Sequence, residues 1–131
     1  PLVTEGKPAL LKTFQDLTAL VDASGICLFT TFGIGLPEVA AQYREAVGSD
    51  ESDEEILLKG ERIWNLEKQF NIAAGVEKDT LPPRLLREKL PEGPAQGKVN
   101  DLYTMLAEYY KARGWDEEGI PTKEKLKELK L

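Results

Sequence analysis

The sequence has no histidine and a single cysteine, Cys27, among its 131 residues. Without histidine, no serine or cysteine nucleophile can be paired with an imidazole base. A single cysteine excludes an internal disulfide bond, and it cannot build a zinc or iron–sulfur site without further ligands. Cys27 is therefore either a small buried residue, which is the common place for a free cysteine, or one ligand of a site that another polypeptide segment completes.

Positively charged residues are fewer than negatively charged ones, and long apolar runs are scarce. The net charge of −6 and the pI near 4.8 argue against nucleic acid and against an anionic membrane surface as partners. The longest uncharged run, residues 23–37, is too short for a bilayer, which needs about 20 apolar residues. A lone cysteine is typical of a reducing compartment, so we expect a cytoplasmic protein. The chain begins with Pro1 rather than Met, which suggests a segment of a longer protein.

Helical periodicity predicts an all-α fold of about six helices in one domain, residues 1–131. The expected helices span residues 8–21, 37–47, 53–74, 80–89, 101–113 and 123–129. Three residues are expected to cap helix N-termini, namely Ser52 in a capping box with Glu55, Asn100, and Thr122. Five aromatic residues are expected to pack between helices rather than to form a binding cage: Trp64, Tyr103, Tyr109, Tyr110 and Trp115.

Two stretches are expected to be buried. In the first helix, Leu10, Phe14, Leu17 and Val21 recur at helical spacing and predict a core-facing stripe that excludes Asp16. Residues 26–36 are apolar and rich in β-branched and aromatic residues, but no second strand is evident. We expect a buried apolar loop here that covers a neighbouring element. If that neighbour is absent, the loop leaves an exposed apolar patch.

Four stretches resemble the C-terminal part of tungsten-containing aldehyde ferredoxin oxidoreductases. The longest is residues 6–27, which ends in the pattern Asp-x-x-Gly-x-Cys formed by Asp22, Gly25 and Cys27. Residues 60–71, 79–84 and 113–126 follow in the order of the family's closing signatures. The resemblance covers nearly the whole chain, but only the last part of a family member. It implies that the chain is the C-terminal domain of a larger enzyme.

The resemblance also implies roles for individual residues. Asp22 would hydrogen-bond the pterin of the tungsten cofactor, and Cys27 would be the fourth ligand of a 4Fe–4S cluster that lies against the pterin. Ile26 and Leu28 would contact the pterin through backbone groups. The physical chemistry is consistent, since a carboxylate can accept two N–H donors from a guanidine-like edge.

In the family, an aldehyde is oxidised with water to a carboxylate and the electrons pass to ferredoxin. The remaining ligands would lie outside this chain, so we expect it to be inactive alone and to bind neither tungstopterin nor the 4Fe–4S cluster tightly. The implied partners are the rest of the enzyme chain, ferredoxin, a small aldehyde and, since the family often dimerises, a second copy. Two alternatives remain: a stand-alone helical subunit that acts in binding or electron transfer, and an interaction module of the same fold without redox chemistry.

Overall fold

The computed structural model describes residues 3–76 and 78–131. Over these residues the chain forms six α-helices and one short 3-10 helix, without a β-strand, which confirms the all-α prediction. The elements are, in order, α1 (Lys7–Ala23), η1 (Leu28–Phe32), α2 (Leu36–Val47), α3 (Asp53–Ala73), α4 (Pro83–Arg87), α5 (Leu102–Arg113) and α6 (Lys123–Leu129).

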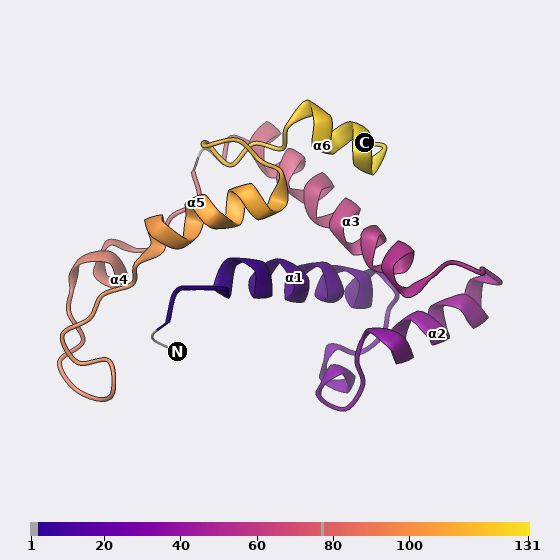
Figure 1. Cartoon of the computed structure of the whole chain (residues 1–131), viewed down its shortest axis with the longest axis horizontal. Coiled ribbons are helices and arrows are strands. Elements are labelled where there is room, and N and C mark those ends of the chain that lie inside the picture. Colours follow the sequence, from indigo (N-terminus) through magenta and orange to yellow (C-terminus); the bar gives the residue numbers. More distant parts are fainter. Residues whose placement is uncertain (1–2, 77) are drawn as a thin grey trace.

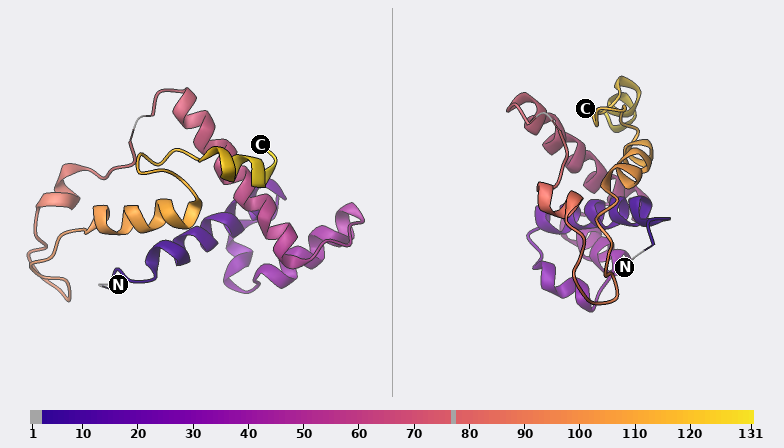
Figure 2. Two further views of the ribbon diagram at one scale, coloured as in Figure 1. Left: turned by 45° about the horizontal axis from the view of Figure 1, so that its top comes forward. Right: turned by 90° about the vertical axis from the view of Figure 1, so that its left-hand side faces the viewer.

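Helix α1 lies at the centre of the arrangement (Figure 1). It packs against α3 and α5, while α2 and α6 pack against α3. The other views show α4 and the loop after it at the opposite end of the molecule from α2 (Figure 2). The C-terminal end of α1 therefore lies beside α2 and η1, where the chain turns.

Two clusters form the core. In the first, Leu20 and Val21 of α1 pack against Val39, Ala40 and Ile56 of α2 and α3. The second lies between α3, α5 and the segment after α5. It contains the aromatic residues Trp64, Tyr109, Tyr110 and Trp115, packed with Leu106. The packing role predicted for the aromatic residues is confirmed for these four, whereas Tyr103 is exposed.

Local capping explains where several helices begin. Ser52 Oγ accepts the N–H of Glu55 at 3.2 Å, and the Glu55 carboxylate accepts the N–H of Ser52 at 2.8 Å, so the capping box starts α3 as predicted. Thr122 caps α6 in the same way, through the N–H of Lys125. The prediction for Asn100 is wrong, because Asp101 occupies the N-cap of α5. Helix α4 is shorter than the predicted 80–89.

The predicted stripe of α1 is wrong in its first half. Leu10 is 57% exposed and Phe14 is 58% exposed, whereas Asp16 is 3% exposed. The helix turns this carboxylate inward because a buried arginine, Arg113 of α5, pairs with it there. The predicted burial of residues 26–36 is also wrong for its aromatic residues, since Phe29 is 78% and Phe32 is 88% exposed. No described element covers η1. Its side chains therefore form the exposed apolar patch that was expected if the covering neighbour were absent.

None of the helices in the described part of the chain combines the length and the apolar character that crossing a bilayer requires.

Candidate functional site at the end of helix α1

The four predicted site residues lie close together in the sequence: Asp22 in the last turn of α1, Ile26 and Cys27 in the turn that follows, and Leu28 at the start of η1. Ser24 closes the helix, because its N–H (3.0 Å) and its Oγ (2.7 Å) both donate to the carbonyl oxygen of Leu20. Gly25 then turns the chain at φ +72°, a left-handed conformation that glycine adopts readily, and its N–H donates to the carbonyl of Asp22 at 3.1 Å. The site residues thus span the end of α1, the turn after it and the start of η1.

Cys27 is exposed. It is the N-cap of η1, and its carbonyl oxygen accepts hydrogen bonds from the N–H of Thr30 at 2.9 Å and from its Oγ1 at 2.7 Å. These bonds fix the backbone and leave the thiol accessible. The expectation of a buried structural thiol, favoured by base rates alone, is therefore wrong.

Asp22 and Leu28 are exposed, while Ile26 is half-buried and packs on the first core cluster. Among the described residues, no hydrogen bond or ion pair involves the Asp22 carboxylate. The backbone N–H groups of Ile26 and Leu28 likewise have no acceptor in this part of the chain. The turn therefore offers one thiol, one carboxylate and free backbone donors, while Ile26 fastens it to the core.

These groups fit a partial cofactor site and not a complete one. No cluster of three or more histidine, cysteine, aspartate or glutamate residues that could hold a metal occurs among residues 3–76 and 78–131. A cluster of iron and sulfide takes four thiolates, of which this chain offers one. At Gly25, nothing lies within 4 Å of the place where a Cβ would be, so a flat ligand could approach the backbone. The residues fit one cluster ligand and one acceptor for a pterin.

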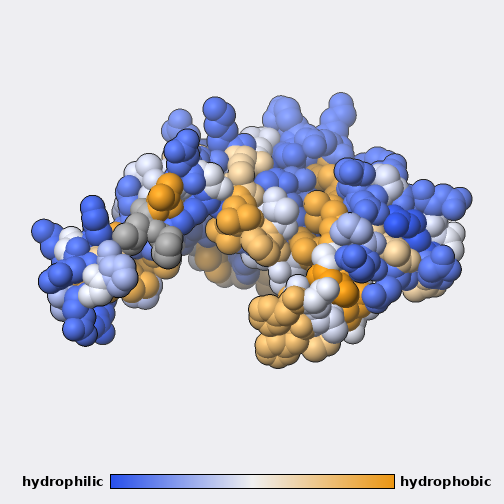
Figure 3. Space-filling view, turned by 60° about the horizontal axis from the view of Figure 1, so that its bottom comes forward, coloured by the Kyte–Doolittle hydropathy of each residue, from blue (hydrophilic) through white to orange (hydrophobic). Residues whose placement is uncertain are grey.

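Exposed apolar side chains lie next to this turn. They belong to η1 (Leu28, Phe29, Phe32), while a second exposed apolar group on α1 (Leu10, Leu11, Phe14) lies two helical turns or more before Asp22 and lines a cavity. Figure 3 shows apolar side chains gathered over this face of the molecule. The rings of Phe29 and Phe32 stack on each other with centroids 6.1 Å apart, without further cover. Extended apolar surface of this kind marks contact with another polypeptide.

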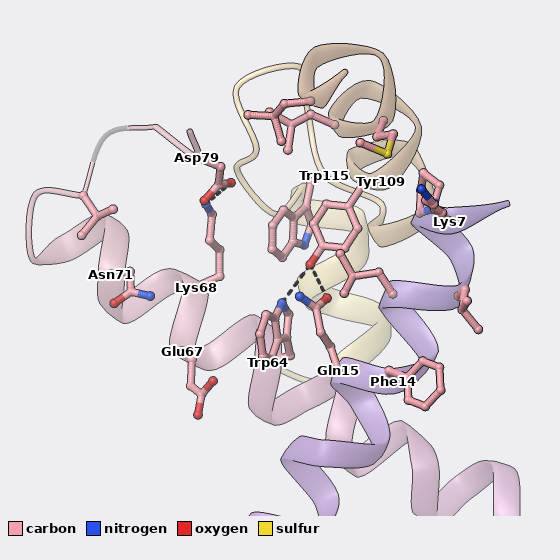
Figure 4. Close-up of a pocket in the computed structure, with 17 residues that line it drawn as sticks. Lys7, Phe14, Gln15, Trp64, Glu67, Lys68, Asn71, Asp79, Tyr109 and Trp115 are labelled. Carbon is pink, nitrogen blue, oxygen red and sulfur yellow. Dashed lines mark hydrogen bonds and ion pairs between the residues drawn. The ribbon is translucent and has the colours of Figure 1, made fainter. Parts of the chain in front are cut away.

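A cavity of about 580 Å³ lies between α1, α3 and α5 (Figure 4). At one side, Trp64 Nε1 donates to Tyr109 Oη at 3.1 Å, and the Tyr109 hydroxyl donates to Gln15 Oε1 at 2.7 Å. At another, the Asp79 carboxylate accepts from Lys68 at 2.7 Å and from the hydroxyl of Tyr110 at 2.8 Å. None of the four predicted site residues lines this cavity.

Charged groups buried beside α1 are the feature that the sequence did not reveal. Asp16 pairs with Arg113 and with Lys12, and Lys12 also reaches Glu61 Oε2 at 3.1 Å. Glu61 Oε1 accepts no hydrogen bond from the described residues, although Lys125 Nζ lies 3.4 Å away. Burial lowers the pKa of Lys125, but hydrogen bonding to Glu128 and the charge of Glu61 outweigh it, so that this pKa is raised. The spacing of Lys12 and Asp16 is visible in the sequence, whereas the role of Arg113 is not.

The comparisons with known proteins agree with the resemblance. The family model described as aldehyde ferredoxin oxidoreductase, domains 2 and 3, matches residues 1–131. A tungsten-containing aldehyde ferredoxin oxidoreductase of Pyrococcus abyssi is 52% identical over 98% of this chain, and one of Pyrococcus furiosus is 50% identical over 97%. A more distant relative is the aliphatic sulfonate oxidoreductase, WOR-like subunit, of Pyrococcus furiosus, at 31% identity over 96% of the chain.

The chain therefore belongs to the aldehyde ferredoxin oxidoreductase family, of which it is a C-terminal segment. It spans 22% of the length of each of these relatives. The rest of each relative has no counterpart in this chain.

Proposed function

We propose that this chain is the part of a tungsten-containing aldehyde ferredoxin oxidoreductase that contributes Asp22 and Cys27 to a shared cofactor site. The observation that carries the proposal is the presence of an unpaired carboxylate in the last turn of α1 and of an accessible thiol in the turn that follows. The names of the relatives support the reaction class. The reaction would oxidise a small aldehyde with water to a carboxylate and pass the released electrons to ferredoxin, while the protons leave to solvent.

Cys27 would supply one thiolate to a 4Fe–4S cluster. The hydrogen bonds from Thr30 to its carbonyl hold the backbone of Cys27, so that the sulfur is presented in a fixed direction. Backbone donors near a ligand sulfur raise the reduction potential of such a cluster. The free N–H of Leu28 is available for this purpose within the described structure. When bound, the cluster would supply the path for electrons toward ferredoxin.

Asp22 would accept hydrogen bonds from the N–H groups of the tungstopterin. A carboxylate that meets a guanidine-like edge can form two parallel bonds, which fixes the plane of the ligand. The backbone groups of Ile26 and Leu28 would contact the same ligand. Because Ile26 packs on Leu20, Val21 and their neighbours, its position is set by the core.

The rest of the enzyme chain would supply the other ligands and would cover the apolar side chains of η1 and α1. Alone, this chain would be inactive and would bind neither cofactor tightly, since one thiolate cannot hold a cluster. A cytoplasmic location and a homodimer of the whole enzyme belong to the same proposal. Reducing conditions would protect the exposed thiol before the cluster is assembled.

The test is the substitution Cys27→Ser in the full-length enzyme that carries this segment. Iron content and visible absorption should fall relative to the unchanged enzyme. Thr31→Ser is the matched control, because it lies in the same segment and keeps the hydroxyl that donates to the Leu28 carbonyl at 2.7 Å. Full iron content and unchanged absorption in the Cys27→Ser enzyme would show that the thiol is not a ligand. That outcome would favour an interaction module without redox chemistry.

A further inference from the structure

A buried charge pair holds α1 six residues before Asp22. Asp16 is 3% exposed and Arg113 is fully buried. Arg113 Nη1 donates to Asp16 Oδ1, and its Nη2 donates to Gln15 Oε1 at 2.7 Å. Arg113 Nε donates to Tyr109 Oη at 3.0 Å, and Lys12 donates to Asp16 Oδ2 at 2.8 Å. With a further bond from Nη2 to the carbonyl oxygen of Lys12 at 3.4 Å, the arginine thus contacts three residues of α1, and both carboxylate oxygens of Asp16 are bonded.

The backbones of α1 and α3 meet at the same residue. A Cβ at Gly60 of α3 would overlap the carbonyl group of Asp16. This approach leaves no side chain between the two helices, so it fixes the distance between them where Arg113 binds from α5. Helices α1, α3 and α5 therefore meet at Asp16, in keeping with the packing of α1 against both other helices (Figure 1).

A charge pair of this kind specifies geometry more strictly than apolar packing does. An α-helix has 3.6 residues per turn, so successive side chains point about 100° apart. A rotation of α1 by one residue would therefore carry Asp16 away from Arg113. Asp16 would then keep only Lys12 of its own helix, and the buried guanidinium of Arg113 would lose its carboxylate partner, which is strongly unfavourable. The apolar contacts of Leu20 and Val21 are non-directional and would tolerate small rotations better. Buried polar pairs that fix register are the best-attested use of such interactions.

We propose that Asp16, Arg113 and Gly60 form a register lock that sets the rotation and axial position of α1, and thereby the direction in which Asp22 and Cys27 are presented. Asp16 and Arg113 are positioning residues, since neither belongs to the turn. The importance of this direction for cofactors rests on the function proposed above. The lock itself is a property of this chain and can be tested without a cofactor.

The single cysteine makes the test direct. A nitroxide on Cys27 and a second on an Arg62→Cys substitution, at an exposed site of α3, report the distance between the turn and α3 by pulsed electron paramagnetic resonance. The unchanged background should give one narrow distance population. The double variant Asp16→Leu/Arg113→Met, which leaves no unpaired buried charge, should fold and give a shifted or additional population. Folding is checked by circular dichroism.

Leu129→Ala is the control for general loosening, because Leu129 is buried in α6 and lies outside the lock. It should lower thermal stability and keep the single distance population. The inference is overturned if the double variant keeps the original narrow population, if the control shifts as the double variant does, or if the unchanged background already shows several populations.

The full-length enzyme separates this inference from the proposed function. The double variant should retain its iron but shift the reduction potential of the cluster, whereas Cys27→Ser should lose iron. Retention of iron in Cys27→Ser would end the proposed function, while the distance measurement would still decide the lock. If Cys27→Ser loses iron but the reduction potential of the double variant is unchanged, the lock does not act on the cofactor. The proposed function would still hold in that case.

Discussion

Replacement of Arg113 by methionine should destabilise the chain strongly. The substitution leaves the carboxylate of Asp16 buried without its main partner, and removal of one member of a buried ion pair costs about 3–5 kcal/mol. Lys12 still reaches Asp16 Oδ2 at 2.8 Å, so we expect the lower end, about 3 kcal/mol. The guanidinium also lies 5.4 Å from the ring centroids of Trp64 and Tyr109, and the methionine sulfur would restore part of that contact.

For a chain of this size each 1 kcal/mol lowers the melting temperature by about 4 °C, so a decrease of about 12 °C is expected. Urea unfolding followed by circular dichroism measures the free energy directly. The matched control is Arg62→Met on α3, where the arginine is exposed and the change should stay within about 0.5 kcal/mol. The double variant Asp16→Leu/Arg113→Met should recover most of the loss, since it leaves no unpaired charge. A loss below about 1 kcal/mol for Arg113→Met, as at a surface ion pair, would refute the reasoning.

Two further predictions concern backbone contact and alkaline pH. Gly60→Ala should lower the free energy of unfolding by about 3 kcal/mol or more, because the new methyl group overlaps the carbonyl of Asp16. Gly33→Ala is the control, since the nearest atom there is at an ordinary 3.8 Å, and its urea unfolding should be almost unchanged. Similar urea midpoints for the two variants would contradict the close helix contact. Burial, and then the hydrogen bond to Asp79, raise the pKa of Tyr110 above its usual 10.0. Because this pKa is higher in the folded than in the unfolded chain, the stability it contributes is complete below about pH 10 and is lost as the pH rises. Unfolding free energies measured from about pH 9 to about pH 11 should therefore decline less steeply for Tyr110→Phe than for the unchanged chain; equal slopes would contradict the shift.

Features that depend on neighbouring residues in the sequence were predictable. The starts of α3 and α6 follow from Ser52 and Thr122, whose side chains bond to N–H groups three residues later. The position of the candidate turn likewise follows from a local pattern, since Gly25 ends the helix that precedes Cys27. Each of these signals lies within a few residues of the structure that it specifies.

Features that depend on distant partners were not predictable. Asp16 is buried because Arg113, which lies far along the chain, meets it inside the fold. Periodicity assigns the largest apolar side chains to the interior, so it placed Phe14 inside, although the described part of the chain provides nothing to cover it. The same limit applied to Cys27, for which residue statistics favoured burial.

The two kinds of contact that hold α1 respond to temperature in the same direction. Apolar burial around Leu20 and Val21 weakens on cooling. The cost of removing water from charged groups falls on heating, so the pair between Asp16 and Arg113 becomes relatively more favourable as the temperature rises. Both contacts that hold the helix leading into the turn therefore weaken on cooling and gain as the temperature rises. While the chain stays folded, the orientation of Cys27 should consequently be held more firmly in warm than in cold solution.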